Sequence, residues 1–176
     1  MTAAAAATLR HAETSADIAL ARELFVEYAR WLRVDLCFQG FDQELATLPG
    51  AYAPPRGRLL LAGAKPAAFG CIALRPLETR SGCCGDAPSS RRDNEDGIGE
   101  VKRLFVQPAH RGDGWGRRLA EALITEARAI GYRELKLDTL EWMEDARRLY
   151  AKLGFRECGA YYDNPLPGVV YMALAL

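Results

Sequence analysis

The stretch that most constrains the fold is residues 99–130, GEVKRLFVQPAHRGDGWGRRLAEALITEARAI. Residues 100–106 are rich in β-forming side chains and stop short of Pro108, which cannot continue a ladder of hydrogen bonds. Glycines then stand at every second position, at Gly112, Gly114 and Gly116. Apolar residues follow at spacings of three and four, at Leu119, Leu123, Ala127 and Ile130. The pattern predicts a strand, a tight glycine turn and a long helix that ends at Gly131.

The glycine turn is typical of a phosphate-binding site. The first turn of a helix leaves backbone N–H groups without partners, and the helix dipole makes that end positive. Glycines before the helix allow positive φ angles and a close approach of the backbone to a ligand. We therefore predict a phosphate or diphosphate site at residues 112–116, with Arg111 adding a charge-assisted contact. The alternative is an ordinary glycine-rich turn between a strand and a helix.

Two well-known phosphate loops do not match this turn. The chain holds no Gly-x-x-x-x-Gly-Lys-Ser/Thr string, and a dinucleotide fingerprint would need glycine at the position of Arg117. The string that is present is Arg-x-x-Gly-x-Gly, formed by Arg111, Gly114 and Gly116. It resembles the coenzyme A diphosphate loop of the GNAT N-acetyltransferase superfamily.

A second motif strengthens the resemblance. Residues 146–155, ARRLYAKLGF, are similar to the Ala-x-x-Leu-Tyr-x-x-x-Gly-Phe string of the same superfamily. The resemblance covers most of residues 57–176 at the level of the fold. One departure stands at Met143, where many relatives have an asparagine that contacts the cofactor. That polar contact is therefore in doubt, although the diphosphate loop does not depend on it.

The resemblance implies an α+β (mixed α/β) fold. Its centre is a mixed, mostly antiparallel, twisted sheet of about seven strands, flanked by about four helices. We expect one domain over residues 1–176. A polar segment at 78–97 predicts a flexible loop inside it. A capping box at Thr14 and Asp17 predicts the start of the first helix. Strands are predicted at 7–12, 58–62, 67–75, 134–140, 155–158 and 169–176, with a bulge at Gly70 and a short helix at 42–48.

The implied activity is transfer of an acetyl group from acetyl-CoA to a primary amine of a small molecule or peptide, by direct attack in a ternary complex. No metal is implied. Cofactor contacts are implied along the strand and the turn, at Leu104, Phe105, Val106, Arg111, Gly112, Asp113, Gly114, Trp115, Gly116 and Arg117. Two other functions remain open: an acyl-CoA binding module without catalysis, and an unrelated nucleotide-binding α/β protein, for which Glu134 has suitable spacing.

Two residues are predicted to be catalytic. Glu100 matches a position that supplies the base in some relatives, whereas the alternative is an exposed carboxylate paired with Lys or Arg. Tyr150 is the predicted acid for the departing thiolate, whereas the alternative is a core tyrosine on the apolar face of its helix. Strand alternation places Glu100, Lys102, Leu104 and Val106 on one face, and Val101, Arg103 and Phe105 on the other.

The acceptor site is defined less sharply. If the resemblance holds, Trp31, Leu36, Phe38 and Phe41 are candidates for the acceptor pocket, with a place in the core as the alternative. The loop at 161–168 lies where relatives place walls of the acceptor site. A small-molecule amine is favoured over a protein N-terminus, and a homodimer is left open.

Composition excludes several classes of partner and site. Lys and Arg total 23, as do Asp and Glu, so no electrostatic argument favours nucleic acid or a membrane surface. No apolar run is long enough to span a bilayer, and the N-terminus does not resemble a signal peptide. Five cysteines without a Cys-x-x-Cys pair indicate reduced thiols in a cytoplasmic protein rather than a zinc site. His110 is interpreted as a solvated loop residue.

Overall fold

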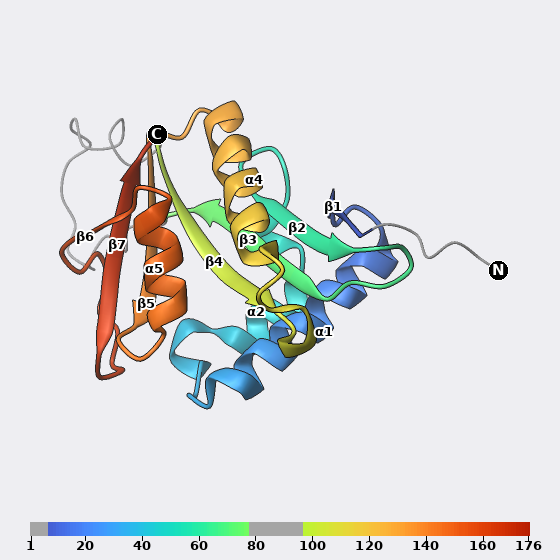
Figure 1. The fold of residues 1–176 in the computed structure, drawn as a ribbon, viewed down its shortest axis with the longest axis horizontal. Helices are drawn as coiled ribbons and strands as arrows, with labels where there is room; N and C mark the ends of the chain where they lie inside the picture. Colours follow the sequence, from blue (N-terminus) through green and yellow to red (C-terminus); the bar gives the residue numbers. More distant parts are fainter. Residues whose placement is uncertain (1–6, 78–96) are drawn as a thin grey trace, which may run out of the picture.

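The computed structural model describes residues 7–77 and 97–176, apart from the side chain of Phe38. A seven-stranded sheet in the order β1-β2-β3-β4-β5-β7-β6 carries helices on both faces (Figure 1). The strands are β1 (Thr8–His11), β2 (Arg58–Gly63), β3 (Gly70–Pro76), β4 (Ile98–Val106), β5 (Glu134–Leu140), β6 (Arg156–Glu157) and β7 (Val169–Ala175). The helices are α1 (Ser15–Leu32), α2 (Phe41–Thr47), α4 (Trp115–Ile130) and α5 (Glu144–Lys152), with short 3₁₀ turns η1 (Cys37–Gln39), η2 (Gly50–Tyr52) and η3 (Pro108–His110). The mixed, mostly antiparallel sheet confirms the predicted fold class.

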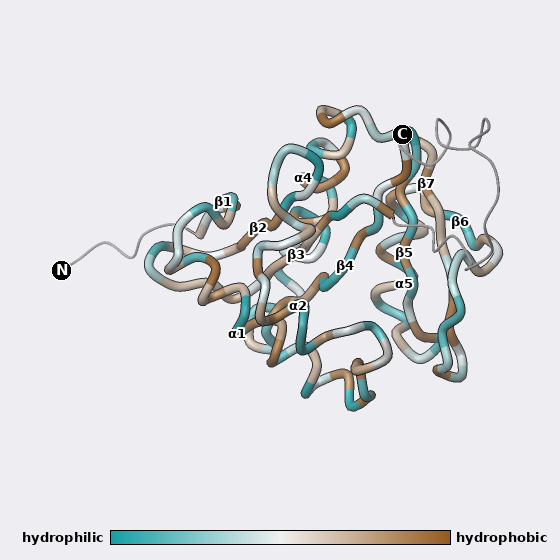
Figure 2. The backbone as a smooth tube through the Cα atoms, turned by 180° about the vertical axis from the view of Figure 1, so that it is seen from behind, coloured by the Kyte–Doolittle hydropathy of each residue, from teal (hydrophilic) through white to brown (hydrophobic). Residues whose placement is uncertain are grey.

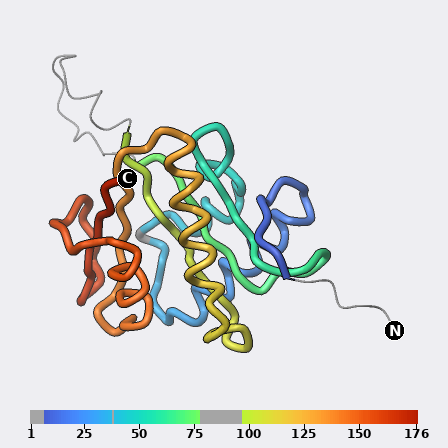
Figure 3. Tube along the Cα trace, turned by 45° about the horizontal axis from the view of Figure 1, so that its top comes forward, coloured from blue at the N-terminus to red at the C-terminus, as the bar shows by residue number. Residues whose placement is uncertain are grey.

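The hydrophobic core has two layers, one on each face of the sheet. The first packs α4 and α5 against the strands and includes Leu119, Leu123 and Tyr150. The second packs α1 and includes Leu24, Phe25 and Phe105. In Figure 3, α4 lies in front of the sheet and α1 behind it. The predicted flexible loop at 78–97 falls outside the described residues, except for Gly97. In the part of the chain that is described, no helix combines the length and hydropathy needed to cross a bilayer.

Local sequence signals locate the helix ends correctly. Thr14 and Asp17 form the predicted capping box at the start of α1, with Thr14 Oγ1 accepting from the Asp17 N–H at 3.1 Å. Gly131 ends α4 with a φ of 99°, a conformation that glycine adopts without a Cβ clash. These ends depend on neighbouring residues alone, which explains why the sequence predicts them well.

The side-chain alternation predicted for β4 is wrong. Cys71 and Ala73 of β3 pair with Phe105 and Lys102, so β4 carries one extra residue at this point. Arg103 adopts a φ of 58° within this bulge. As a result the α4 layer receives Val101, Leu104 and Val106 together, whereas Phe105 joins the α1 layer. The alternating brown and teal of β4 in Figure 2 shows how apolar and charged residues share this strand.

The bulge predicted at Gly70 therefore belongs to β4 instead. Gly70 has a different role, because a Cβ there would lie 3.1 Å from the Phe105 carbonyl oxygen and 3.3 Å from Leu119 Cδ1. The absence of a side chain at Gly70 allows β3, β4 and α4 to approach closely.

Candidate active site

The turn before α4 has the positive φ angles that were predicted for its glycines. Gly112 and Gly114 adopt φ angles of 91° and 79°, and no atom lies within 4 Å of a Cβ built at either residue. No side chain caps the N-terminus of α4, and its hydrogen bonding begins with the Arg118 N–H donating to the Gly114 carbonyl at 3.1 Å. A capping box closes the N-terminus of α1, whereas α2 and α5 lack a side-chain cap as α4 does, so the open space around two glycines with positive φ is what distinguishes the start of α4. The amides at the start of α4 are thus left available to an external acceptor.

Aromatic contacts hold this turn in place. The His110 ring stacks on Phe69 with centroids 4.0 Å apart, and Trp115 meets the same phenyl ring edge-on at 5.2 Å. The Arg118 guanidinium lies over Trp115 at 4.7 Å. His110 lies in the connection between β4 and α4 as predicted, and it is half-buried because one face of its ring packs against Phe69. These contacts with Phe69 hold the turn and the start of α4 against the β2–β3 connection.

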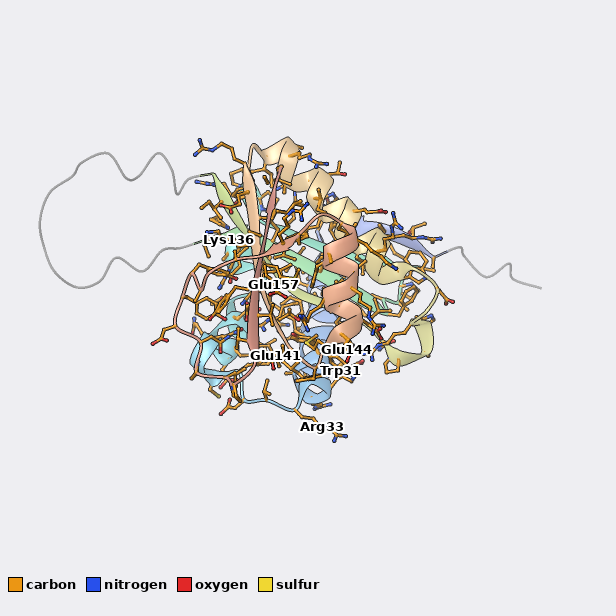
Figure 4. The ribbon with its side chains drawn as sticks, turned by 60° about the vertical axis from the view of Figure 1, so that its left-hand side comes forward. Trp31, Arg33, Lys136, Glu141, Glu144 and Glu157 are labelled. Atoms are coloured by element: carbon orange, nitrogen blue, oxygen red, sulfur yellow. The ribbon has the colours of Figure 1, made fainter. Side chains whose placement is uncertain are left out.

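The side chain of Arg111 lies toward α1 rather than over the glycines. Its Nε donates to the Val106 carbonyl at 2.9 Å, and its guanidinium lies 4.5 Å from the Trp31 ring centroid and 5.6 Å from that of Phe105. Partial burial lowers the pKa of Arg111. Trp31 also meets Trp142 at 5.5 Å, which places it at the start of α5, where Figure 4 labels Trp31 beside Glu144.

A cleft opens where β4 and β5 diverge. These parallel strands pair only from Ile98 to Glu100 and from Glu134 to Lys136, whereas β5 remains paired with β7 along its whole length. The divergence is visible in Figure 1, where β4 and β5 separate away from the end that they share. The cleft is partly open to solvent, and its volume of about 620 Å³ includes that open solvent. It is lined by Tyr28, Leu32, Leu36, Gln39, Val101, Lys102, Arg103, Leu104, Asp138, Thr139, Leu140, Met143, Ala146, Tyr150 and Leu166.

Tyr150 lines this cleft from α5. Its side chain is packed against Phe155 with ring centroids 5.5 Å apart, and the residue is 7% exposed. Burial raises the pKa of Tyr150 above its ordinary value, so the phenol keeps its proton at neutral pH. Among the described residues, no hydrogen-bond partner of its hydroxyl is found. The structure thus places an unpaired phenol at the wall of the cleft.

Glu100 does not line the cleft. It is 2% exposed and lies at the last paired position of β4 and β5, before the strands diverge. Its Oε2 accepts from Arg75 at 2.7 Å, and its Oε1 accepts from the Tyr161 hydroxyl at 3.2 Å. Lys102 Nζ lies 3.4 Å from the same Oε1. The carboxylate is therefore enclosed by two cations and a phenol.

The sequence reading missed Asp138, a carboxylate that does line the cleft. It lies on β5 two residues beyond the last residue paired with β4. Its Oδ1 accepts from Lys102 at 3.0 Å, and its Oδ2 accepts from the Tyr162 hydroxyl at 2.8 Å. Burial by itself would raise the pKa of Asp138, but Lys102 and Tyr162 hold it below its ordinary value. In the sequence, Asp138 is marked only by the alternation of apolar and polar residues along β5. That pattern shows which face of the strand is polar, but not whether this face borders a cleft or bulk solvent.

The predicted acceptor-pocket residues divide between the cleft and the core. Leu36 lines the cleft, whereas Trp31 and Phe41 pack with the α1 side of the molecule. Phe38 has no described side chain. From the predicted loop at 161–168, Leu166 reaches the cleft. Met143, which replaces the asparagine of many relatives, also lines the cleft, and its Sδ lies 3.6 Å from Thr139 Oγ1.

The described ranges 7–77 and 97–176 contain no group of three or more His, Cys, Asp or Glu side chains placed to hold a metal. The described residues provide an uncapped helix N-terminus, whose Gly116 packs against Leu149 of α5, and a cleft lined by the protonated phenol of Tyr150. That combination suits an anionic carrier molecule and transfer of a group within the cleft.

Comparison with known proteins agrees with this arrangement. The sequence model described as the acetyltransferase (GNAT) family matches residues 21–155. An uncharacterized N-acetyltransferase of Schizosaccharomyces pombe is 38% identical over 154 residues, which cover 87% of this chain and 85% of that protein.

Two solved structures share the fold. A GNAT-family acetyltransferase from Staphylococcus aureus MU50 has a TM-score of 0.72 at 16% identity, covering 97% of this chain and 99% of that one. The protein yncA from Salmonella typhimurium, solved with its cofactor acetyl-CoA, has a TM-score of 0.69 at 20% identity, covering 97% and 94%. With the family match extending over residues 21–155, this chain belongs to the acetyltransferase (GNAT) family.

Proposed function

We propose that this protein transfers an acetyl group from acetyl-CoA to the primary amine of a small molecule or peptide. The observation that carries the proposal is the glycine turn at the uncapped N-terminus of α4, where Gly116 packs against Leu149 of α5, the neighbour in sequence of Tyr150, whose unpaired phenol lines the cleft. Family membership supports acetyl transfer, and the Salmonella typhimurium neighbour, which has the same fold, was solved with acetyl-CoA.

The residues of the turn fit a diphosphate. The open space around Gly112 and Gly114 leaves their backbone accessible, and the dipole of α4 favours negative charge at this point. We assign the diphosphate contacts to the backbone of residues 112–117, which includes Asp113, Trp115, Gly116 and Arg117. Arg111 is the predicted charged contact, and to make it the guanidinium would have to leave Trp31.

The acyl portion is assigned to the unpaired edge of β4. When bound, acetyl-CoA supplies the acyl group, whose carbon forms a bond to the amine nitrogen as its bond to sulfur breaks. The backbone of Leu104, Phe105 and Val106 lies beyond the last β4–β5 pair. The N–H groups of Leu104 and Val106 alternate with the Phe105 N–H, which is on the side paired with β3, so these two are the candidates to stabilise the developing oxyanion.

Tyr150 is proposed as the acid. Its phenol donates a proton to the departing sulfur, and the proton that the nitrogen loses after its attack on the acyl carbon restores the phenol; the proton that the ammonium loses before attack goes to the base. Glu100 remains the predicted base. Because Arg75, Lys102 and Tyr161 enclose its carboxylate, a proton from the amine would reach it through water rather than by direct contact.

A thiol-release assay tests the proposal. Purified protein is mixed with acetyl-CoA and a panel of amines, amino acids and peptides, and free coenzyme A is measured together with the acetylated product. Release that depends on both substrates supports the proposal. Tight binding of acetyl-CoA without release across the panel would instead indicate a binding module without catalysis.

A further inference from the structure

Three polar groups that line the cleft have unused hydrogen-bonding capacity, from Gln39, Asp138 and Tyr28, and the first two share the Tyr162 hydroxyl as a hydrogen-bond partner. We call these three residues the polar corner. Gln39 Nε2 donates to the Tyr162 hydroxyl at 3.2 Å, but its buried Oε1 has no partner within the described part of the chain. A buried carbonyl oxygen without a donor is destabilising, so this atom marks a position where a ligand donor would bind favourably.

Asp138 can accept one more hydrogen bond. A carboxylate offers about four acceptor positions. Three donors reach Asp138, namely Lys102, Tyr162 and the Asn164 amide, the last at 3.3 Å. The fourth position is available to a donor that enters the cleft, which Asp138 lines.

Tyr28 supplies the third group from α1. Its ring packs against Phe105 with centroids 6.0 Å apart, and it lines the cleft. No hydrogen bond of its hydroxyl is found among the residues that the structure describes. Burial raises the pKa of Tyr28 to about 12, so at neutral pH the hydroxyl is protonated and keeps lone pairs that can accept.

Other residues of the cleft lining are apolar, or are cations whose charge is already paired with a carboxylate. Its apolar walls are Leu32, Leu36, Leu140 and Leu166. Of the two cations in the lining, Arg103 makes a two-pronged ion pair with Glu44, with N–O distances of 3.0 and 2.6 Å. Lys102 lies between Asp138 and Glu100. A carboxylate that entered here would meet Asp138 without gaining an unpaired cation from the described lining.

We propose that the polar corner binds the amino group of the acceptor, and that the acceptor is a primary amine with an apolar body and no carboxylate beside the amine. The inference rests on the proposed function and specifies its substrate class. An amino group brings two or three N–H donors, which match the free positions on Gln39, Asp138 and Tyr28. The leucines then receive the carbon skeleton.

A matched series of amines tests the proposed class of acceptor. Phenethylamine, phenylalaninamide and phenylalanine share a phenyl ring and a primary amino group. Phenylalaninamide is nearly as large as phenylalanine but lacks its negative charge, so a comparison of these two isolates the effect of the charge. We expect thiol release to be fastest with phenethylamine. The kcat/KM for phenylalanine should be about tenfold or more below that for phenylalaninamide, because its carboxylate is desolvated without a partner.

The outcomes of this series separate the two proposals. If phenylalanine reacts as efficiently as phenylalaninamide, acetyl transfer stands and the inference about the acceptor is overturned. If none of the three amines releases thiol but another amine, amino acid or peptide of the wider panel does, acetyl transfer stands and the inference is overturned. If nothing in the wider panel releases thiol although acetyl-CoA binds, both the transferase function and the inference are overturned.

Variants test the residues themselves. We expect Asp138→Asn and Gln39→Leu each to raise KM for phenethylamine about tenfold or more, with a smaller change in kcat and an unchanged Kd for acetyl-CoA. Asp145→Asn removes an exposed carboxylate and is the matched control. Calorimetric binding of phenethylamine to protein saturated with coenzyme A provides a readout that does not depend on turnover. An unchanged Kd for the amine in both variants would overturn the assignment.

Discussion

The guanidinium of Arg103 in β4 forms a two-pronged ion pair with the carboxylate of Glu44 in α2, and both side chains are largely buried. The bulge of β4 turns Arg103 toward α2, and the same guanidinium lies 5.1 Å from the centre of the Phe41 ring. Tyr52 also donates to Glu44, at 2.8 Å. The short helix α2 is thus attached to the sheet by a buried charge pair that also positions the cleft residue Arg103.

Removing one partner of the Arg103–Glu44 ion pair should strongly destabilise the folded protein. We expect Glu44→Ala to lower the free energy of unfolding by about 3–5 kcal/mol, because it leaves a buried guanidinium without a counter-charge. Urea denaturation followed by circular dichroism measures the change. Glu144→Ala is the control, since Glu144 pairs with Arg148 in solvent and its loss should cost less than about 1 kcal/mol. Equal losses in the two variants would contradict the buried pair.

The buried acids should make stability depend on acidic pH. Burial would raise the pKa of Glu44, but its hydrogen bonds and the charge of Arg103 hold it below the ordinary value of 4.5. The pKa of Asp138 is lowered from 3.8 in the same way by Lys102. A group whose pKa is lower in the folded state stabilises the protein above its unfolded pKa, and this contribution is lost as the pH falls through the folded value.

Unfolding by urea at a series of pH values measures how the free energy of unfolding changes as the pH falls. The contribution of these acids should be constant from neutral pH down to about pH 5 and should fall steadily below it. Glu44→Gln should show a shallower decline than the parent protein over the acidic range. An equally steep decline in the variant would show that Glu44 does not contribute to the acid sensitivity.

The proposed acid can be tested without removing its packing. Tyr150→Phe keeps the ring contact with Phe155 and deletes only a hydroxyl without a described partner. We expect kcat to fall about a hundredfold or more, while the Kd for acetyl-CoA and the melting temperature change little. Single-turnover thiol release and calorimetry measure the two effects. Unchanged turnover would remove Tyr150 from the mechanism.

The glycine turn offers a test with an internal control. Gly114 and Gly131 both have positive φ angles, of 79° and 99°, and a Cβ at either would meet no atom within 4 Å. They lie at opposite ends of α4, so alanine at either position should cost similar stability through backbone strain, of order 1 kcal/mol.

Only Gly114→Ala should weaken the binding of acetyl-CoA, by about tenfold or more, because its Cβ would occupy the space assigned to the diphosphate. Isothermal titration of both variants with acetyl-CoA decides the point. If Gly131→Ala weakens binding as much as Gly114→Ala does, the effect comes from α4 as a whole and not from the turn.

Sequence reasoning succeeded where the determining contacts are local. The stop of α4 at Gly131 and the capping box at Thr14 and Asp17 depend on residues a few positions apart. The two motifs, around Gly114 and Tyr150, sufficed to predict the family, which the family match confirms. Strand alternation failed in β4, because one extra residue opposite β3 at Arg103 reverses the side-chain pattern that follows.

The sequence alone determined the glycine turn and the two motifs, because these depend on short-range spacing. The motifs carry the family resemblance, and the mixed sheet was predicted from that resemblance. Only the tertiary structure decided which carboxylate reaches the cleft. Glu100 lies where β4 and β5 are still paired, and Asp138 lies where they have parted, a difference set by the register of two strands separated by an entire helix. Burial and ion pairing of such groups depend on long-range packing, which the periodicity of a strand cannot show.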